Sequence, residues 1–377
     1  MSVSRLADLG DPTLCGRLVF KIGSALLVGR DGRPRRAWLK TLVTEIADAR
    51  ARGQDIVVVS SGAIALGAAR LGLAKGGRAC LADAQAAAAV GQIALAELWS
   101  ELLGTQGLIA AQLLLTLEDL EDRRRYLNAS ATLGRLLKAG AVPVVNENDS
   151  VATQEIRFGD NDRLAARVAQ AARADAVMLL SDVDGLYDRN PADPAARLLP
   201  EVRGVTKDIR AMATGGSGSG LGSGGMTAKL LAAEIAERAG IALAIINGTH
   251  DYPVARALAG PVGTLFLPRR SDGARKSWLG GRIRLKGTLV IDQGAMDALA
   301  RGKSLLATGI TCVEGDFTRG DVVAIRDAQG HVLAQGLVEY DASECRLLQG
   351  RKSADHAVIL GYAPRSAVVH RDQLVLK

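Results

Sequence analysis

Six stretches within the first 268 residues are almost entirely apolar, and each has the length of a strand. They are RLVFKIG (17–23), DIVVVS (55–60), LIAAQLLLT (108–116), AVPVVNEN (141–148), AVMLLS (176–181) and IALAIING (241–248). Apolar residues follow one another without the alternation of a half-exposed strand, which is the pattern of parallel strands buried on both faces. The hydrophobic pattern therefore predicts a mainly parallel sheet.

Amphipathic patterns with helical spacing fill the intervals between these strands. The predicted helices span 37–52, 82–103, 122–139, 161–173 and 226–239. A chain that alternates strands and helices in this order forms an open, doubly wound α/β sheet with helices on both of its faces.

The pattern changes after PRRSDGARKSWLGGRIRLKG (268–287). Short strand-like pieces then follow one another, separated by turns at EGD, RGD and AQG, with a single convincing helix near 294–302. We therefore predict two domains, an α/β domain over 1–270 and a small β-rich domain over 276–377.

Composition narrows the class of protein. The chain has 377 residues, which suffices for two domains, and 48% of them are hydrophobic. Its four cysteines and four histidines show no CxxC, HExxH or HxxxH spacing, so we expect neither a disulfide framework nor a protein-built transition-metal site. We find no signal peptide and no apolar run of membrane-span length, which predicts a cytoplasmic protein without a membrane partner. The net charge of +7 permits an anionic partner such as a nucleotide or RNA.

The residues that end the predicted strands are small, polar or charged. Ligands of open parallel sheets bind beyond the carboxyl ends of the strands. These ends carry Lys21, SSGA (60–63), NENDS (146–150) and SDVDGLYD (181–188), and FGDND (158–162) precedes a predicted helix. Each motif alone has a structural explanation, since serine, asparagine and aspartate also cap helices. Their collection at one edge of a sheet predicts a ligand site.

A glycine-rich run, ATGGSGSGLGSGGMTAK (213–229), leads into the last predicted helix of the first domain. It contains a formal GxGxxG, but no strand leads directly into it, and it lacks the Gly-Lys-Ser/Thr ending of a P-loop. Backbone amides at a glycine turn and a helix N-terminus bind anions, and Lys229 lies close to that end of the helix. The run therefore predicts a phosphate site completed by Lys229.

These residues are typical of phosphoryl transfer, in which catalysis is mostly positioning and cationic stabilisation of the transferring group. Lys21 and Lys229 are the candidate cations. The carboxylates of Asp149, Asp160 and Asp162 would repel a polyphosphate unless cations accompany them. Mg²⁺, the two lysines or an ammonium group on the acceptor would each serve, and the last indicates an amino acid acceptor.

The motifs KIGSALL, SSGAIALG, NENDSVAT, FGDNDRLAA, LLSDVDGLYDRNP and GSGGMTAKLLAAEIA occur here in the order and spacing of one enzyme family. In these motifs the chain resembles the glutamate 5-kinases, within the amino acid kinase family. Its tail, which includes GTLVIDQGAMDAL and KSLLATGITCVEGDFTRGDVVAI, resembles a PUA domain. The resemblance covers nearly the whole chain. It implies a three-layer αβα sandwich with an open, mainly parallel sheet, plus a small β-barrel-like PUA domain.

The resemblance also implies an activity and its ligands. The activity is ATP-dependent phosphorylation of the γ-carboxylate of L-glutamate to γ-glutamyl 5-phosphate, the first step of proline biosynthesis. ATP and Mg²⁺ are the expected cofactors, with no direct protein ligand to the metal assigned. Proline is the expected feedback inhibitor and γ-glutamyl phosphate reductase a candidate partner. A homo-oligomer, dimer or tetramer, is also expected.

Roles of individual residues follow from the same resemblance. Lys21 and Lys229 would stabilise the transferring group, and Asp162 would orient both lysines. Glutamate would be bound by Ser61, Asp149 and Asn161, with Asp160 beside them. ATP would be bound by Lys21, Ser181, Asp182, Ser223, Gly224, Gly225, Met226, Thr227, Ala228 and Lys229. No general base is expected, because the attacking carboxylate is already ionised at neutral pH.

Two positions depart from the family pattern, and alternative functions stay open. Ala25 and Ala228 stand where a serine and a threonine are common, so a hydroxyl contact to phosphate is missing or comes from Thr227. Acetylglutamate kinase and aspartokinase are the nearest alternatives within the enzyme class. RNA binding through the PUA-like tail is the alternative from another class, and RKSWLGGRIRLK (275–286) is its candidate phosphate contact.

Overall fold

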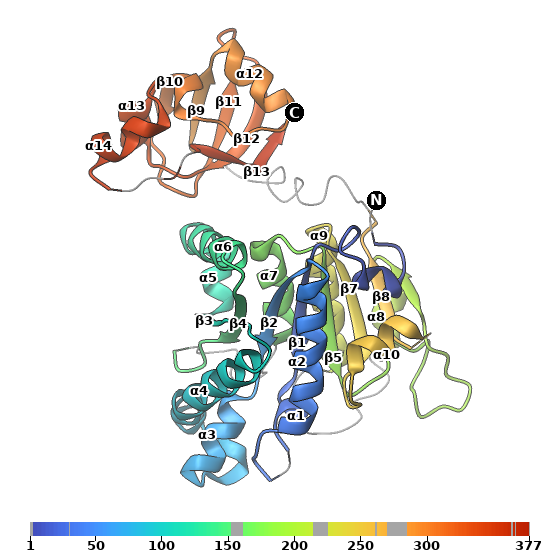
Figure 1. Ribbon diagram of the computed structural model, residues 1–377. Coiled ribbons are helices and arrows are strands. Elements are labelled where there is room, and N and C mark those ends of the chain that lie inside the picture. The colour runs from blue at the N-terminus through green and yellow to red at the C-terminus, as the bar shows by residue number, and fades with distance from the viewer. Residues whose placement is uncertain are drawn as a thin grey trace. The chain divides into compact units, whose positions relative to one another are not determined.

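The computed structural model describes residues 3–29, 31–151, 161–213, 225–260, 262–269, 285–362, 365 and 367–376. The chain divides into two compact units, Met1–Ser271 and Asp272–Lys377. Each unit has its own sheet (Figure 1).

An eight-stranded sheet forms the centre of the first unit. Its strands are β1 (Arg17–Ile22), β2 (Asp55–Ser60), β3 (Ala110–Leu115), β4 (Val142–Glu147), β5 (Ala176–Ser181), β6 (Glu201–Arg203), β7 (Ala242–Asn247) and β8 (Thr264–Leu267). They lie in the order β3-β4-β2-β1-β5-β7-β8-β6. All neighbours pair in parallel except β7 and β8. The six strands expected from the sequence are confirmed, whereas β6 and β8 were not expected because they are only three and four residues long.

Helices cover both faces of this sheet (Figure 1). The helices of the first unit are α1 (Ser24–Leu27), α2 (Arg36–Ala51), α3 (Ala63–Leu71), α4 (Leu81–Gly104), α5 (Leu117–Glu121), α6 (Arg123–Lys138), α7 (Asn161–Ala172), α8 (Lys207–Ala213), α9 (Met226–Arg238) and α10 (Pro253–Ala259). The five predicted helices are confirmed as α2, α4, α6, α7 and α9. The structure therefore has the expected three layers.

Successive side chains of each strand point to opposite faces of the sheet. Phe20 and Ile22 of β1 pack in the core cluster that includes α2 and α4, whereas Val19 packs in the cluster that includes α7 and α9. Lys21 follows Val19 by two positions and therefore faces α7 and α9. This alternation places a charged side chain of a buried strand on the same side as Asp162 and Lys229.

Helices α3 and α4 cross at two glycines that allow their backbones to touch. A Cβ atom on Gly67 would lie 1.8 Å from the carbonyl oxygen of Ala87, and one on Gly91 would lie 1.8 Å from that of Ala63. No side chain fits at either position without moving a helix. The crossing therefore fixes α4 against the segment that follows β2.

Judged by length and composition alone, α4 is the one helix within the described ranges that could cross a membrane. Its side chains Leu95, Leu98 and Trp99 lie in the core cluster of the first unit. An apolar helix packed in this way is expected in the core of a globular domain.

The second unit contains a five-stranded sheet in the order β10-β9-β11-β12-β13. The strands are β9 (Gly287–Ile291), β10 (Ile310–Gly315), β11 (Val322–Arg326), β12 (Val332–Val338) and β13 (Val369–Leu376), and the helices are α12 (Gln293–Ala300), α13 (Ala342–Leu348) and α14 (His356–Leu360). The helix predicted near 294–302 is confirmed as α12, while α13 and α14 were not predicted. A separate apolar cluster that includes Phe317, Val323 and Tyr340 forms the core of this sheet.

Candidate active site

A carboxylate held between two lysines lies at the carboxyl end of β1. Lys21 Nζ lies 2.5 Å from Asp162 Oδ1, and Lys229 Nζ lies 3.2 Å from Asp162 Oδ2. The side chains come from β1, the first turn of α7 and the first turns of α9, three segments far apart in the sequence. The exposed fractions of the Lys21, Asp162 and Lys229 side chains are 10%, 1% and 8%. The structure thus brings together the three residues predicted to be catalytic.

Asp162 keeps its negative charge in this buried position. Burial alone would raise the pKa of Asp162, but Lys21 and Lys229 hold that pKa below its usual range. One carboxylate therefore faces two ammonium groups, which leaves a net positive charge for an anionic ligand. Because Asp162 fixes both lysines before a ligand arrives, their positions are preorganised.

The turn after β2 brings Ser61 to the same edge of the sheet. Gly62, the N-cap of α3, has a left-handed φ of 115°, a conformation that glycine adopts most easily. The turn is fixed on the β1 side by a hydrogen bond from Ser61 N to the Ile22 carbonyl, 3.1 Å long. The Ser61 hydroxyl accepts a hydrogen bond of 2.6 Å from Asn161 Nδ2. Two of the predicted glutamate-binding residues are therefore in contact.

The hydrogen bonds continue from Asn161 to residues that the sequence did not identify. Asn161 Nδ2 also donates to Asn146 Oδ1 at 3.3 Å, and Asn146 Nδ2 donates to Gln92 Oε1 at 2.8 Å. Asn161 Oδ1 is buried and has no hydrogen-bond partner among the described residues. A buried acceptor of this kind favours a ligand that carries an N–H donor.

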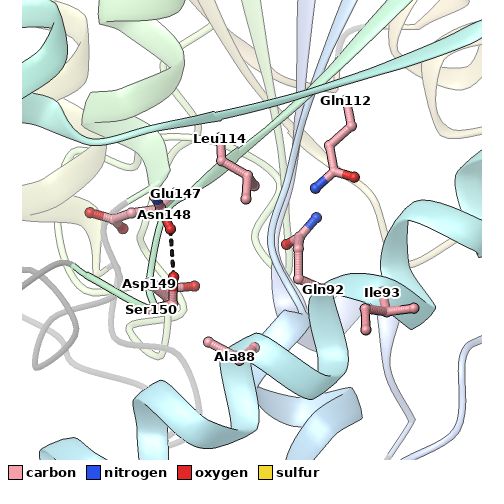
Figure 2. Close-up of a pocket in the computed structure, with 10 residues that line it drawn as sticks. Ala88, Gln92, Ile93, Gln112, Leu114, Glu147, Asn148, Asp149 and Ser150 are labelled. Atoms are coloured by element: carbon pink, nitrogen blue, oxygen red, sulfur yellow. Dashed lines mark hydrogen bonds between the residues drawn. The ribbon is translucent and has the colours of Figure 1, made fainter.

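A cavity of about 220 Å³ adjoins these amides at the carboxyl ends of β3 and β4. It is lined by Ala88, Ala89, Gln92, Ile93, Gln112, Leu114, Glu147, Asn148, Asp149 and Ser150. Figure 2 shows Gln92 of α4 and Gln112 of β3 on one side of it and residues 147–150 on the other. The Ser150 hydroxyl donates to Asn148 Oδ1 at 2.7 Å, which closes the turn after β4. The wall contains two carboxylates, Glu147 and Asp149.

The acidity of Asp149 is strongly perturbed. Burial raises its pKa from 3.8 to about 6, and the nearby positive charge of Arg78 opposes only part of that rise. A cationic ligand would stabilise the ionised form of a carboxylate in this environment, because opposite charges attract. The site near Asp149 is therefore suited to an ammonium group.

Besides Lys21, the described residues predicted to bind ATP lie at the end of β5 and at the start of α9. Ser181 is buried and its hydroxyl lies 3.2 Å from Asp182 Oδ1, while Asp182 itself is exposed. Gly225 is the N-cap of α9, and a Cβ atom placed on it would meet nothing within 4 Å. Helix geometry leaves the first amides of α9 without an intrahelical acceptor. Thr227 is exposed in the same turn, and Met226 and Ala228 are half-buried.

Comparisons with known protein families match both parts of the chain. The model of the amino acid kinase family matches residues 16–247, and that of the PUA domain matches residues 287–360.

The chain belongs to the amino acid kinase family.

Curated relatives of this family member match over full length. The protein from Novosphingobium aromaticivorans is 67% identical over 100% of both chains, and it is named glutamate 5-kinase. Proteins with the same name from Sphingopyxis alaskensis and Zymomonas mobilis are 58% and 54% identical. They cover 98% and 97% of this chain, over 100% and 92% of their own lengths. The two-domain kinase predicted from the motifs is therefore confirmed at the level of family and domain composition.

Three of the predicted site residues, Asp160, Ser223 and Gly224, lie outside the described residues. Among the residues that the structure describes, no group of three or more His, Cys, Asp or Glu side chains is placed to hold a metal ion. Asn146 and Gln92 were missed for different reasons. Asn146 lies within the NENDS motif at the end of a predicted strand, so its position could have indicated a role in the site. Gln92 lies in the middle of an alanine-rich helix, where no feature of the sequence distinguishes it.

Proposed function

We propose that this member of the amino acid kinase family transfers the γ-phosphoryl group of ATP to the γ-carboxylate of L-glutamate. The product is γ-glutamyl 5-phosphate, and the reaction is the first step of proline biosynthesis. The names of its full-length relatives support this reading over acetylglutamate kinase, aspartokinase or RNA binding. The observation that carries the proposal is the Lys21–Asp162–Lys229 arrangement at the middle of the sheet edge.

The strand order supports separate subsites for the two substrates, with the lysines between them. Strands β4 and β2, which end near Asp149 and Ser61, lie on one side of β1, and β5, which ends in Ser181, lies on the other. The amino acid would then bind on the β2–β4 side and the nucleotide on the β5 side. Lys21, at the end of β1, would then lie next to the transferring group.

The glutamate subsite is argued from the groups that it offers. The Asp149 carboxylate and the buried Asn161 Oδ1 are acceptors suited to the α-ammonium group. Ser61 would contact the γ-carboxylate, because its turn lies next to the end of β1 and therefore next to Lys21. An acetylated substrate has no ammonium group, so it would leave Asp149 without a counter-charge. This difference favours glutamate over acetylglutamate.

The nucleotide subsite combines Ser181, Asp182 and the start of α9. The amides of Gly225–Thr227 and the positive end of the helix dipole would bind the phosphates of ATP, with the predicted contribution of Ser223 and Gly224. Asp162 is already paired with two lysines, so it is not free to bind a metal ion. We therefore expect the metal to enter the site bound to ATP. Mg²⁺ would be held mainly by the ATP phosphates, where it neutralises their charge. Asp182, which directly follows Ser181, is the carboxylate of this proposed subsite.

The reaction itself requires positioning and charge stabilisation. An oxygen of the γ-carboxylate, ionised above a pKa of about 4.3, attacks the γ-phosphorus of ATP, and the bond to the bridging oxygen of ADP breaks. No proton moves in this step, so no general base is needed. Lys21 and Lys229 would stabilise the equatorial oxygens of the transferring group, while Asp162 holds their ammonium groups in place.

The remaining expectations belong to this proposal. Proline, which shares the ammonium and carboxylate of glutamate, would compete at the same subsite as a feedback inhibitor. γ-Glutamyl phosphate reductase would consume the acyl phosphate. A homo-oligomeric, cytoplasmic enzyme is the expected biological form.

Hydroxylamine trapping tests the proposed function directly. The purified chain should form a hydroxamate from L-glutamate in the presence of MgATP, with one ADP released for each acyl phosphate trapped. N-acetylglutamate and aspartate should give at most a few per cent of that rate. Absence of hydroxamate with glutamate, or a higher rate with either alternative, would contradict the proposal.

A further inference from the structure

Helix α4 makes three contacts to the segments that carry the proposed amino acid subsite. Gly91 packs against α3 directly behind the Ser61 turn. Trp99 Nε1 donates a hydrogen bond of 2.9 Å to Ser60 Oγ, and Gln92 Oε1 accepts one of 2.8 Å from Asn146 Nδ2. Gln92 and Trp99 are seven residues apart, so they lie on the same face of the helix. Their partners are at the carboxyl ends of β4 and β2.

The hydrogen bond to Gln92 determines which way the neighbouring amides point. A side-chain amide has an acceptor at one end and a donor at the other, so fixing one end fixes the other. Because Asn146 Nδ2 donates to Gln92, Asn146 Oδ1 faces Asn161. Asn161 must then present Nδ2 to Asn146 and to Ser61, which keeps its Oδ1 available as an acceptor.

We propose that Gln92 is a positioning residue for the amino acid substrate, because its carbonyl oxygen fixes the orientation of the Asn146 and Asn161 amides. The inference rests on the proposed function, since it assigns the Asn161 oxygen to the α-ammonium group of glutamate. Gln92 itself need not touch the substrate. Without its carbonyl oxygen, Asn146 can turn over and present a donor to Asn161, and Asn161 then presents a donor to the ammonium group. Two donors facing each other disfavour binding.

The test compares glutamate with glutarate, the same dicarboxylate without the ammonium group. In Gln92→Leu we expect the KM for glutamate to rise about tenfold, equivalent to about 1.4 kcal/mol. The KM for ATP and the kcat should stay within about twofold. The inhibition constant of glutarate should be unchanged, because glutarate does not need the Asn161 acceptor. This selective loss separates positioning from general damage to the fold.

Two further variants complete the experiment. Gln92→Glu keeps an acceptor for Asn146 Nδ2 and should restore the KM for glutamate to within about threefold of the parent value. Gln106→Leu is the matched control, because Gln106 follows α4, is exposed and does not line the cavity. Its KM for glutamate should change less than twofold.

Several results would overturn the inference. They are an unchanged KM for glutamate in Gln92→Leu, an equal loss of glutamate and glutarate binding, or no recovery in Gln92→Glu. If the parent chain forms no hydroxamate from glutamate, the proposed function itself fails. If the parent is active and Gln92→Leu behaves like the parent, only the role of Gln92 fails.

Discussion

The raised pKa of Asp149 predicts that glutamate binding depends on pH in a window where few other groups titrate. Burial raises this pKa to about 6, and an ammonium ligand requires the ionised carboxylate. With a pKa of 6, about 9% of Asp149 is ionised at pH 5 and about 91% at pH 7. The dissociation constant for glutamate should therefore be about tenfold higher at pH 5 than at pH 7, and nearly constant above pH 7.

Calorimetric titration of glutamate into the ATP-free protein is the most direct assay, because it avoids the titration of the ATP phosphates. Glutamate keeps its ammonium charge across this range, and its γ-carboxyl group, with a pKa near 4.3, is already about 80% ionised at pH 5. At pH 6, binding should release about half a proton, measured as the dependence of the binding enthalpy on the ionisation enthalpy of the buffer. Release should fall toward zero at pH 8.

Asp149→Asn is the control for this assignment. The variant should bind glutamate more weakly at pH 7, and its affinity should not change between pH 5 and 7. An equal affinity of the parent protein at pH 5 and 7, or the same pH dependence in Asp149→Asn, would refute the reasoning.

The raised pKa of Asp149 also determines how its ionisation changes the stability of the fold. The folded state retains this proton up to about pH 6, whereas an unfolded Asp loses it near 3.8, so ionisation lowers the free energy of unfolding as the pH rises through that window.

Three further predictions concern the lysines, the helix crossing and the domain division. Lys229→Ala should lower kcat by about three orders of magnitude with the fold intact, because it removes a preorganised cation from the transferring group; a rate within tenfold of the parent in the hydroxamate assay would exclude that role. Gly91→Ala should lower the free energy of unfolding by about 1–3 kcal/mol in urea titrations because its Cβ overlaps the Ala63 carbonyl. Gly134→Ala, in the open on α6, should instead raise it by about 0.5–1 kcal/mol, and equal effects would contradict the close crossing. Residues 1–271 alone should unfold cooperatively, because the apolar clusters in the described parts of the two units share no residues; a non-cooperative circular-dichroism melt would contradict this independence.

The sequence predicts the sheet of the first unit well because burial on both faces leaves a strong signal. Each long strand is a nearly unbroken apolar run, and Lys21 stands out because apolar residues flank it on both sides within such a run. The short strands β6 and β8 were not predicted, because three or four residues are too few for a recognisable hydrophobic pattern. Their pairing depends on tertiary contacts.

The chemistry of the site is predictable only in part. Lysine and aspartate can be assigned from motifs at strand ends, but the 2.5 Å and 3.2 Å contacts of Asp162 require the fold to bring β1, α7 and α9 together. The acidity of Asp149 depends on burial, which the NENDS motif does not reveal. Gln92 is found only from its hydrogen bond, because a glutamine in a helix also suits an exposed position.

The order of the strands has a consequence for engineering. Under the proposed function, residues of the acceptor subsite come from β2, β4 and α4, residues of the nucleotide subsite come from β5 and α9, and β1 and the start of α7 belong to both. A designer who seeks a different acceptor can therefore confine a substitution library to the cavity wall formed by α4 and residues 147–150. Lys21, Asp162 and Lys229 would then stay unchanged, and Gly91, which lies between the lining residues Ala89 and Gln92, would be kept because its Cβ position overlaps α3.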